Sequence, residues 1–118
     1  LNMFQNILKF SRFKYKDSYF PRLRIGALWL NSMGFSVGTK FLIDYSREKI
    51  IIKLFDSNKL DNQYCLQFNV RRKLNKNKTT IPIIDLAGGW LSEIGFNVSD
   101  NVIITAEFGI INIIPLKA

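Results

Sequence analysis

Apolar and polar residues alternate along several short segments of the chain, and this period-two pattern predicts a protein built mainly from β-strands. The clearest example is 64–74, where Tyr64, Leu66, Phe68 and Val70 stand at every second position. Runs of isoleucine at 50–52 and around Asn112 point the same way, because β-branched side chains suit extended backbone better than helix.

The pattern occurs twice. A constant offset of 61 residues aligns two segments without a gap and gives nine identities, including both tryptophans. The identical pairs are Pro21 with Pro82, Trp29-Leu30 with Trp90-Leu91, Gly34-Phe35 with Gly95-Phe96, Val37 with Val98, Ile43 with Ile104, Ile50 with Ile111, and Ile52 with Ile113. Such self-similarity indicates a duplicated structural unit.

Each copy predicts the same order of elements: a basic strand, a strand that begins at proline, a short helix that ends before glycine, and a hairpin. In the first copy these are 8–15, 21–25, 26–33 and the strand pair 40–45 and 49–55. In the second they are 64–74, 82–86, 87–94 and the strand pair 102–106 and 110–116.

The two copies predict one compact domain over residues 1–118, with repeats at 8–55 and 64–116 and a polar linker at 56–63. A single copy is too small to bury its own apolar faces, and a short linker holds the two at high effective concentration. We therefore expect an intramolecular pseudo-dimer with Trp29 and Trp90 in a shared core. Pairing between two chains, as a homodimer, is the alternative.

Charge narrows the range of partners. The chain carries 17 basic and 9 acidic residues, a net charge of +8, which favours anionic partners and nucleic acid first among them. Basic residues gather in two equivalent windows, from Lys9 and from Arg71, and the candidate nucleic-acid-binding residues are Arg12, Lys14, Lys16, Arg22, Arg24, Arg71, Arg72, Lys73, Lys76 and Lys78. Tyr15 and Tyr19 are candidates for stacking on bases. The alternative is that the charges keep edge strands from aggregating.

The residues offer little for catalysis. The chain has no histidine, and its acids form no evident carboxylate pair or metal-ligand set, so we predict neither a metal nor a cofactor. The single cysteine, Cys65, excludes an internal disulfide, suits a core position and fits a reducing cytoplasm. No apolar run approaches the roughly 20 residues of a membrane span.

The repeated motif resembles the SymE-like toxins of bacterial toxin–antitoxin systems. Copy two gives Ile81-Pro82-Ile83-Ile84-Asp85-Leu86-Ala87-Gly88-Gly89-Trp90-Leu91 and then Gly95-Phe96; copy one gives Phe20-Pro21 through Ile25, then Trp29-Leu30 and Gly34-Phe35. Copy one departs from the family at Ala27 and copy two at Ser99, where the family has glycine.

This resemblance implies a fold and an activity. The fold would be mostly β with two short helices, a tandem pseudo-twofold swapped-hairpin β-barrel like that of the AbrB and MazE proteins. The function would be that of a toxin acting on nucleic acid, either by cleaving RNA or by binding nucleic acid and blocking its use. Endoribonuclease activity is implied by the resemblance alone, and no catalytic residue is assigned.

Two other functions remain open from the residues. One is a non-enzymatic DNA-binding regulator or antitoxin of AbrB-like build, which would share the basic surface. The other is a protein-interaction module whose basic surface docks an acidic partner.

Overall fold

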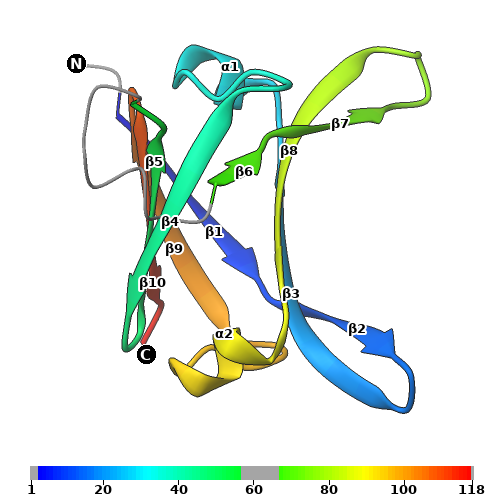
Figure 1. Cartoon of the computed structure of the whole chain (residues 1–118), viewed down its shortest axis with the longest axis vertical. Coiled ribbons are helices and arrows are strands. Elements are labelled where there is room, and N and C mark those ends of the chain that lie inside the picture. Colours follow the sequence, from blue (N-terminus) through cyan, green and yellow to red (C-terminus); the bar gives the residue numbers. More distant parts are fainter. Residues whose placement is uncertain (1–2, 57–66, 118) are drawn as a thin grey trace.

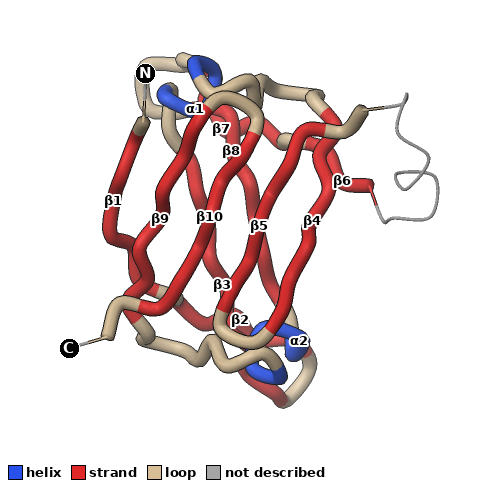
Figure 2. Tube along the Cα trace, turned by 90° about the vertical axis from the view of Figure 1, so that its left-hand side faces the viewer, coloured by secondary structure: helices blue, strands red, loops and turns tan. Residues whose placement is uncertain are grey.

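The computed structural model describes residues 3–56 and 67–117, and within them two antiparallel sheets form a compact globule with two short helices. The six-stranded sheet has the order β1 (Phe4–Lys9), β9 (Asn101–Glu107), β10 (Ile110–Pro115), β5 (Lys49–Leu54), β4 (Lys40–Ser46) and β6 (Gln67–Asn69). The four-stranded sheet has the order β2 (Ser11–Tyr15), β3 (Ser18–Gly26), β8 (Thr80–Ala87) and β7 (Arg71–Leu74). The helices α1 (Trp29–Ser32) and α2 (Gly89–Glu93) lie at opposite ends of the molecule (Figure 2).

In each sheet, the strands counted from one edge are equivalent, one by one, to the strands of the other copy counted from the opposite edge. In the six-stranded sheet the hairpins β4–β5 and β9–β10 meet at the centre, and the first strand of each copy pairs with the hairpin of the other: β1 with β9, and β6 with β4. The central pairs include Ile51 with Asn112 in one sheet and Arg24 with Asp85 in the other. Each pair joins equivalent residues of the two copies, which stand 61 apart in the sequence. A pseudo-twofold axis that relates the copies would therefore pass through both pairs.

The core lies between the inner faces of the two sheets. Phe35, Phe96, Leu30 and Leu91 are fully buried there, together with the central isoleucines of the hairpins. Trp29 and Trp90, expected in a shared core, are half-buried and pack against this core without being fully buried in it. The residues one position further along, Leu30 and Leu91, occupy the buried side of each short helix.

The predicted closed barrel is also wrong, because both sheets are open. The ends of β2–β3 and of β7–β8 project away from the six-stranded sheet on the same side (Figure 1), so the outer edges of the four-stranded sheet turn away from it. The mostly β composition with two short helices is confirmed.

Each predicted first strand is interrupted where the chain passes from one sheet to the other. Between β1 and β2, Phe10 is buried and its backbone bonds to Ser99 and Asp100; between β6 and β7, Val70 is buried and bonds to Gly38 and Thr39. The predicted start of the second strand, 64–66 with Cys65, and residues 57–63 of the predicted linker lie outside the described residues.

The proline-led strands are longer than predicted, and their prolines lie inside them. The carbonyl of Pro21 accepts the N–H of Gly88, one position beyond the last residue pair of β3 and β8. The N–H that proline lacks would therefore lie outside that ladder, so proline is tolerated there. The carbonyl of Pro82 accepts a bond from Ala27 in the same way.

Both helices are shorter than predicted, because Gly26 and Ala87 still belong to the preceding strands. Each helix ends as predicted at a glycine with positive φ, 91° at Gly34 and 104° at Gly95. The following phenylalanines fold back, and Phe35 and Phe96 donate their N–H groups to Leu30 and Leu91 at 2.9 and 2.8 Å.

The two copies differ at two glycine positions, and both differences have local structural consequences. Ser99 adopts a φ of 75°, close to the 87° of its counterpart Gly38, so serine occupies a backbone conformation that favours glycine. Gly88, which precedes α2, has a φ of 134°. Its counterpart Ala27 does not have a positive φ, and the residue that precedes α1, Leu28, has a φ of −63°. The two helix entries therefore differ.

Candidate nucleic-acid interface

All ten candidate binding residues lie on the four-stranded sheet or in its two turns. Strands β2 and β3 carry Arg12, Lys14, Arg22 and Arg24, with Lys16 in the turn between them; β7 carries Arg71, Arg72 and Lys73, and the turn to β8 carries Lys76 and Lys78. The structure thus brings these ten residues of the two windows together on one sheet, whereas Lys9 lies in β1 of the six-stranded sheet.

The excess positive charge of the chain belongs to this sheet. Segments 11–26 and 71–87 hold ten basic residues and two acids, Asp17 and Asp85, which leaves eight positive charges. The rest of the sequence holds seven basic and seven acidic residues and is balanced. The protein is therefore strongly polarised, with one basic sheet on an otherwise neutral body.

The pairing registers sort these side chains between the two faces of the sheet, since directly opposite residues in antiparallel strands share a face. Leu23, Ile25, Ile84 and Leu86 point into the core. The other face, which we call the outer face, carries Phe13, Tyr15, Phe20, Arg22, Arg24, Arg71, Lys73, Ile81, Ile83 and Asp85.

Asp85 lies at the centre of the outer face and is held by two arginines. Arg22 contacts it through two parallel bonds, Nε to Oδ1 at 3.0 Å and Nη2 to Oδ2 at 2.6 Å, and Arg24 Nη2 donates to Oδ2 at 3.1 Å. The carboxylate side chain is 10% exposed, whereas the two arginine side chains are 32% and 45% exposed.

These contacts fix the ionisation of the cluster. Burial alone would raise the pKa of Asp85, but the hydrogen bonds from Arg22 and Arg24 outweigh it, so the pKa lies below its ordinary value. The hydrogen bond to Asp85 raises the pKa of Arg22 in return. Asp85 is therefore an anion at neutral pH, and its lowered pKa makes it a poor base for proton transfer.

A hollow of about 190 Å³ lies beside this cluster, towards β7. It is lined by Arg24, Arg71, Arg72, Lys73, Ile83 and Asp85. Typical small-molecule sites measure roughly 300–1,000 Å³, so the hollow is small for a buried ligand and has room for a compact anionic group. Three of its cations, Arg24, Arg71 and Lys73, belong to the outer face, whereas Arg72 lies opposite Pro82 on the other face of β7. The one carboxylate in the lining is already bound by arginine.

Tyr15 and Tyr19 occupy opposite faces of the β2–β3 hairpin. Tyr19 lies opposite Lys14 and carries the Arg12 guanidinium 4.4 Å from its ring centre, on the face away from Arg22. Tyr15 lies opposite Ser18 on the outer face, with the Lys16 ammonium 5.6 Å from its ring. The two rings are both more than half exposed, at 53% and 61%, but they cannot contact one ligand on the same face.

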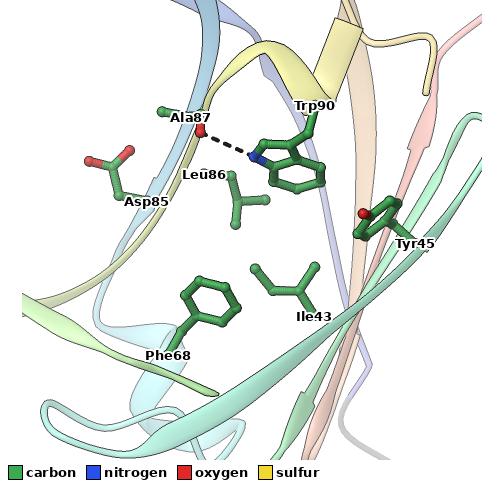
Figure 3. A pocket seen from close by; sticks show the side chains of 7 residues that line it. All are labelled: Ile43, Tyr45, Phe68, Asp85, Leu86, Ala87 and Trp90. Atoms are coloured by element: carbon green, nitrogen blue, oxygen red, sulfur yellow. Dashed lines mark hydrogen bonds between the residues drawn. The ribbon is translucent and has the colours of Figure 1, made fainter. Parts of the chain in front are cut away.

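A second hollow, of about 210 Å³, lies between β4 and the end of β8 (Figure 3). Ile43, Phe68 and Leu86 line it with Tyr45 and Trp90, whose rings lie 5.1 Å apart, and Asp85 stands at its side. Trp90 Nε1 already donates to the carbonyl of Ala87 at 3.1 Å. In the other half of the molecule Phe4 stacks on Trp29 at 4.1 Å, which indicates that this type of position favours an aromatic packing partner over a polar substrate.

Carboxylates elsewhere hold the fold rather than converge on a site. Asp100 accepts the backbone N–H of Asn97, Glu48 pairs with Lys117 at 2.8 Å, and Asp44 lies 3.8 Å from Lys53. Within residues 3–56 and 67–117, no group of three or more histidine, cysteine or acidic side chains is placed to hold a metal ion. In the same part of the chain no helix is both long and apolar enough to cross a bilayer.

No protein-family model, no curated protein and no solved structure matches this chain. The sequence motif and the geometry of the basic sheet therefore carry the functional argument by themselves.

The Asp85 cluster was not predicted from the sequence, although a signal for it was present. Arg24 and Asp85 stand at equivalent positions of the two copies, and equivalent positions meet wherever a pseudo-twofold axis crosses an antiparallel strand pair. An arginine and an aspartate at such a pair of positions predict an ion pair once the axis is known.

Proposed function

We propose that this protein binds nucleic acid through the outer face and turns of its four-stranded sheet, and that it acts by binding rather than by cleaving. One observation carries the proposal: the whole net charge of +8 resides on that sheet, while the remainder of the sequence is neutral. Positive charge concentrated on one sheet of an otherwise balanced chain is the electrostatic footprint of a phosphate-binding protein.

The arrangement of the cations supports this function. The outer face carries Arg22 and Arg24 from the first window and Arg71 and Lys73 from the second, and the two turns of the sheet add Lys16, Lys76 and Lys78. Arg71, Arg72 and Lys73 have no ion-pair partner within the described segments, so they are available for phosphate oxygens. Binding without cleavage is favoured because the one carboxylate on the outer face is locked by two arginines.

The biological role we propose is that of a SymE-like toxin that coats nucleic acid and blocks its use. The duplicated Trp-Leu and Gly-Phe motif supports it, as does the exchange of first strands between the two hairpins, which is the kind of exchange expected of a swapped-hairpin, AbrB-like protein. An AbrB-like regulator of duplex DNA is the second candidate, and the same exchange of strands favours it.

Binding to labelled RNA and to duplex DNA across a salt series, with and without Mg²⁺, tests the proposal. We expect intact RNA to be retained, with affinity that falls steeply as salt rises. Fragmentation of RNA would refute the binding-only mechanism, and retention of neither polymer at low salt would refute the function. Preference for one duplex sequence over random duplex and over RNA would favour the regulator.

A matched pair of double variants locates the surface. Arg71→Ala with Lys73→Ala removes two cations from the outer face, and Lys49→Ala with Lys53→Ala removes two exposed lysines from β5 in the six-stranded sheet. The first pair should weaken binding about tenfold at low salt and reduce the slope of log affinity against log salt by about 1–2. The second pair should leave both quantities nearly unchanged. Equal effects of the two pairs would show that binding is not confined to the four-stranded sheet.

A further inference from the structure

The two halves of the outer face differ in chemistry. On β7, Arg71 and Lys73 lie opposite Ile83 and Ile81 of β8. At the corresponding positions of the other half, Ser11 and Phe13 lie opposite Arg22 and Phe20. One half of the face therefore presents cations at its edge, and the other presents aromatic rings.

The aromatic half is a stacking surface. Phe13 and Phe20 are half-buried and tilted against each other with ring centres 5.7 Å apart, so their packing holds both rings in place. Tyr15 continues the same face towards the turn and is 61% exposed. Bases stack on such rings with little regard to sequence, because every base has a π face.

The Asp85 cluster separates the two halves. It neutralises one charge of the Arg22 and Arg24 pair and ties the Arg22 guanidinium beside the aromatic half. Within the described residues no acid forms an ion pair with Arg71 or Lys73. The carboxylate that lines the same hollow, that of Asp85, is already bound by Arg22 and Arg24. On the outer face, the cations without an ion-pair partner in the described residues are therefore those of β7, across Asp85 from the aromatic rings.

From this division we infer that the ligand of the outer face is single-stranded nucleic acid, with the phosphates of one stretch along β7 and the unstacked bases of another stretch on Phe13 and Tyr15, because β7 and β2 flank opposite ends of the β3–β8 pair. A duplex presents phosphates to a flat surface but keeps its bases stacked on one another, so it could use only the β7 half. The inference rests on the proposed nucleic-acid binding and names the form of polymer and its orientation.

A cycle of protein and ligand changes tests this arrangement. Fluorescence anisotropy would measure the affinity of a labelled 12-nucleotide single strand, the same strand with abasic sites in place of its bases, and the 12-base-pair duplex. Each would be titrated with the wild type, with Phe13→Leu/Tyr15→Ala, and with Phe108→Ala. Phe108 is a matched control, because it is a 73% exposed aromatic residue in the β9–β10 turn of the other sheet.

We expect the wild type to bind the single strand at least tenfold more tightly than the abasic strand, since stacking contributes about 1–3 kcal/mol per base. Phe13→Leu/Tyr15→Ala should lose most of this preference, while its affinity for the abasic strand stays within about twofold of wild type. Phe108→Ala should behave as wild type. The same set with RNA and DNA strands shows whether the sugar matters.

The outcomes separate this inference from the function beneath it. Wild-type affinity for the duplex equal to or above that for the single strand would overturn the inference and leave nucleic-acid binding standing. An unchanged preference for bases in Phe13→Leu/Tyr15→Ala would do the same. No binding of any of the three ligands would overturn both. Tyr15→Ala alone repeats the test if the double variant melts early, because Tyr15 is exposed and its loss does not disturb the core.

Discussion

Replacing Asp85 by asparagine keeps the size of the side chain and removes its charge, and the structure gives the scale of the expected effect. The carboxylate is only 10% exposed and binds two arginines, so its loss should cost more than the roughly 0.2–1 kcal/mol of an exposed ion pair. The arginines are 32% and 45% exposed and can be hydrated by water, so the cost should stay below the roughly 3–5 kcal/mol of a broken buried pair. We therefore expect Asp85→Asn to lower the free energy of unfolding by about 1–2 kcal/mol at pH 7.

The pH dependence of this difference has a definite sign. The pKa of Asp85 is lowered in the folded protein, so the unfolded state binds more protons at acid pH. The stability that the carboxylate contributes is fully present above its unfolded pKa, about 3.9, and is lost as the pH falls through the lower folded value. The free energies of unfolding of wild type and Asp85→Asn should therefore differ at pH 7 and pH 5, and the difference should shrink as the pH falls below about 4.

Urea unfolding followed by circular dichroism at pH 7, 5 and 3 measures this difference. Asp44→Asn is the matched control, because it makes the same change in net charge at a pair that is 3.8 Å apart and exposed on both sides. The control should cost less than about 0.5 kcal/mol. If Asp85→Asn is as stable as Asp44→Asn at pH 7, or if its deficit persists unchanged at pH 3, the reasoning about the cluster is wrong.

Four further predictions concern the fold and the oligomeric state. Ser99→Gly should raise the melting temperature and the free energy of unfolding by about 0.5–1 kcal/mol, because Ser99 holds a φ of 75°; Gly34→Ala should lower both, because its added Cβ would meet side-chain atoms of Leu54 and Phe108 at 3.0–3.1 Å. Phe96→Ala should cost about 3–5 kcal/mol in chemical unfolding, since Phe96 is fully buried and stacks on Phe10. Light scattering coupled to gel filtration should give the mass of a monomer, since β5 and β10 already pair within one chain, and a dimer would indicate that the hairpins exchange between chains.

Much of the fold could be predicted from local pattern. Both hairpins were placed to within about a residue, because β-branched runs on either side of a short polar turn specify a register and leave few alternatives. The helix ends at Gly34 and Gly95 were confirmed for a similar reason, since positive φ is a requirement that the residue itself reveals.

The points at which the chain passes from one sheet to the other could not be predicted. Phe10 and Val70 carry the chain between the sheets without a glycine or a proline at the bend. Both residues face the one core that the sheets share, so the alternation of apolar residues gives no sign of the change. The closed barrel failed for a related reason: whether sheet edges meet depends on the direction of the projecting hairpins, which is set by long-range packing.

The candidate site was predicted in composition and missed in geometry. The two basic windows lie on one sheet, but the sequence could not separate Arg12 and Lys14 from Arg22 and Arg24, which lie on opposite faces. Faces follow from register, and register was unknown for the first two strands of each copy.

The duplication explains how the face came to have two unlike halves. In a dimer of identical chains, a residue on the twofold axis meets its own copy, so position 24 would bring together two arginines or two aspartates. Joining both copies in one chain lets the two positions differ, and here Arg24 meets Asp85 at 3.1 Å. The same freedom places Phe13 on one edge and Lys73 on the other. A symmetric dimer would read a ligand with twofold symmetry, whereas this sheet has a direction, and a single strand of nucleic acid also has one. Recognition of strand direction is therefore what the proposed single-strand binding would gain from a fused chain over a pair of separate ones.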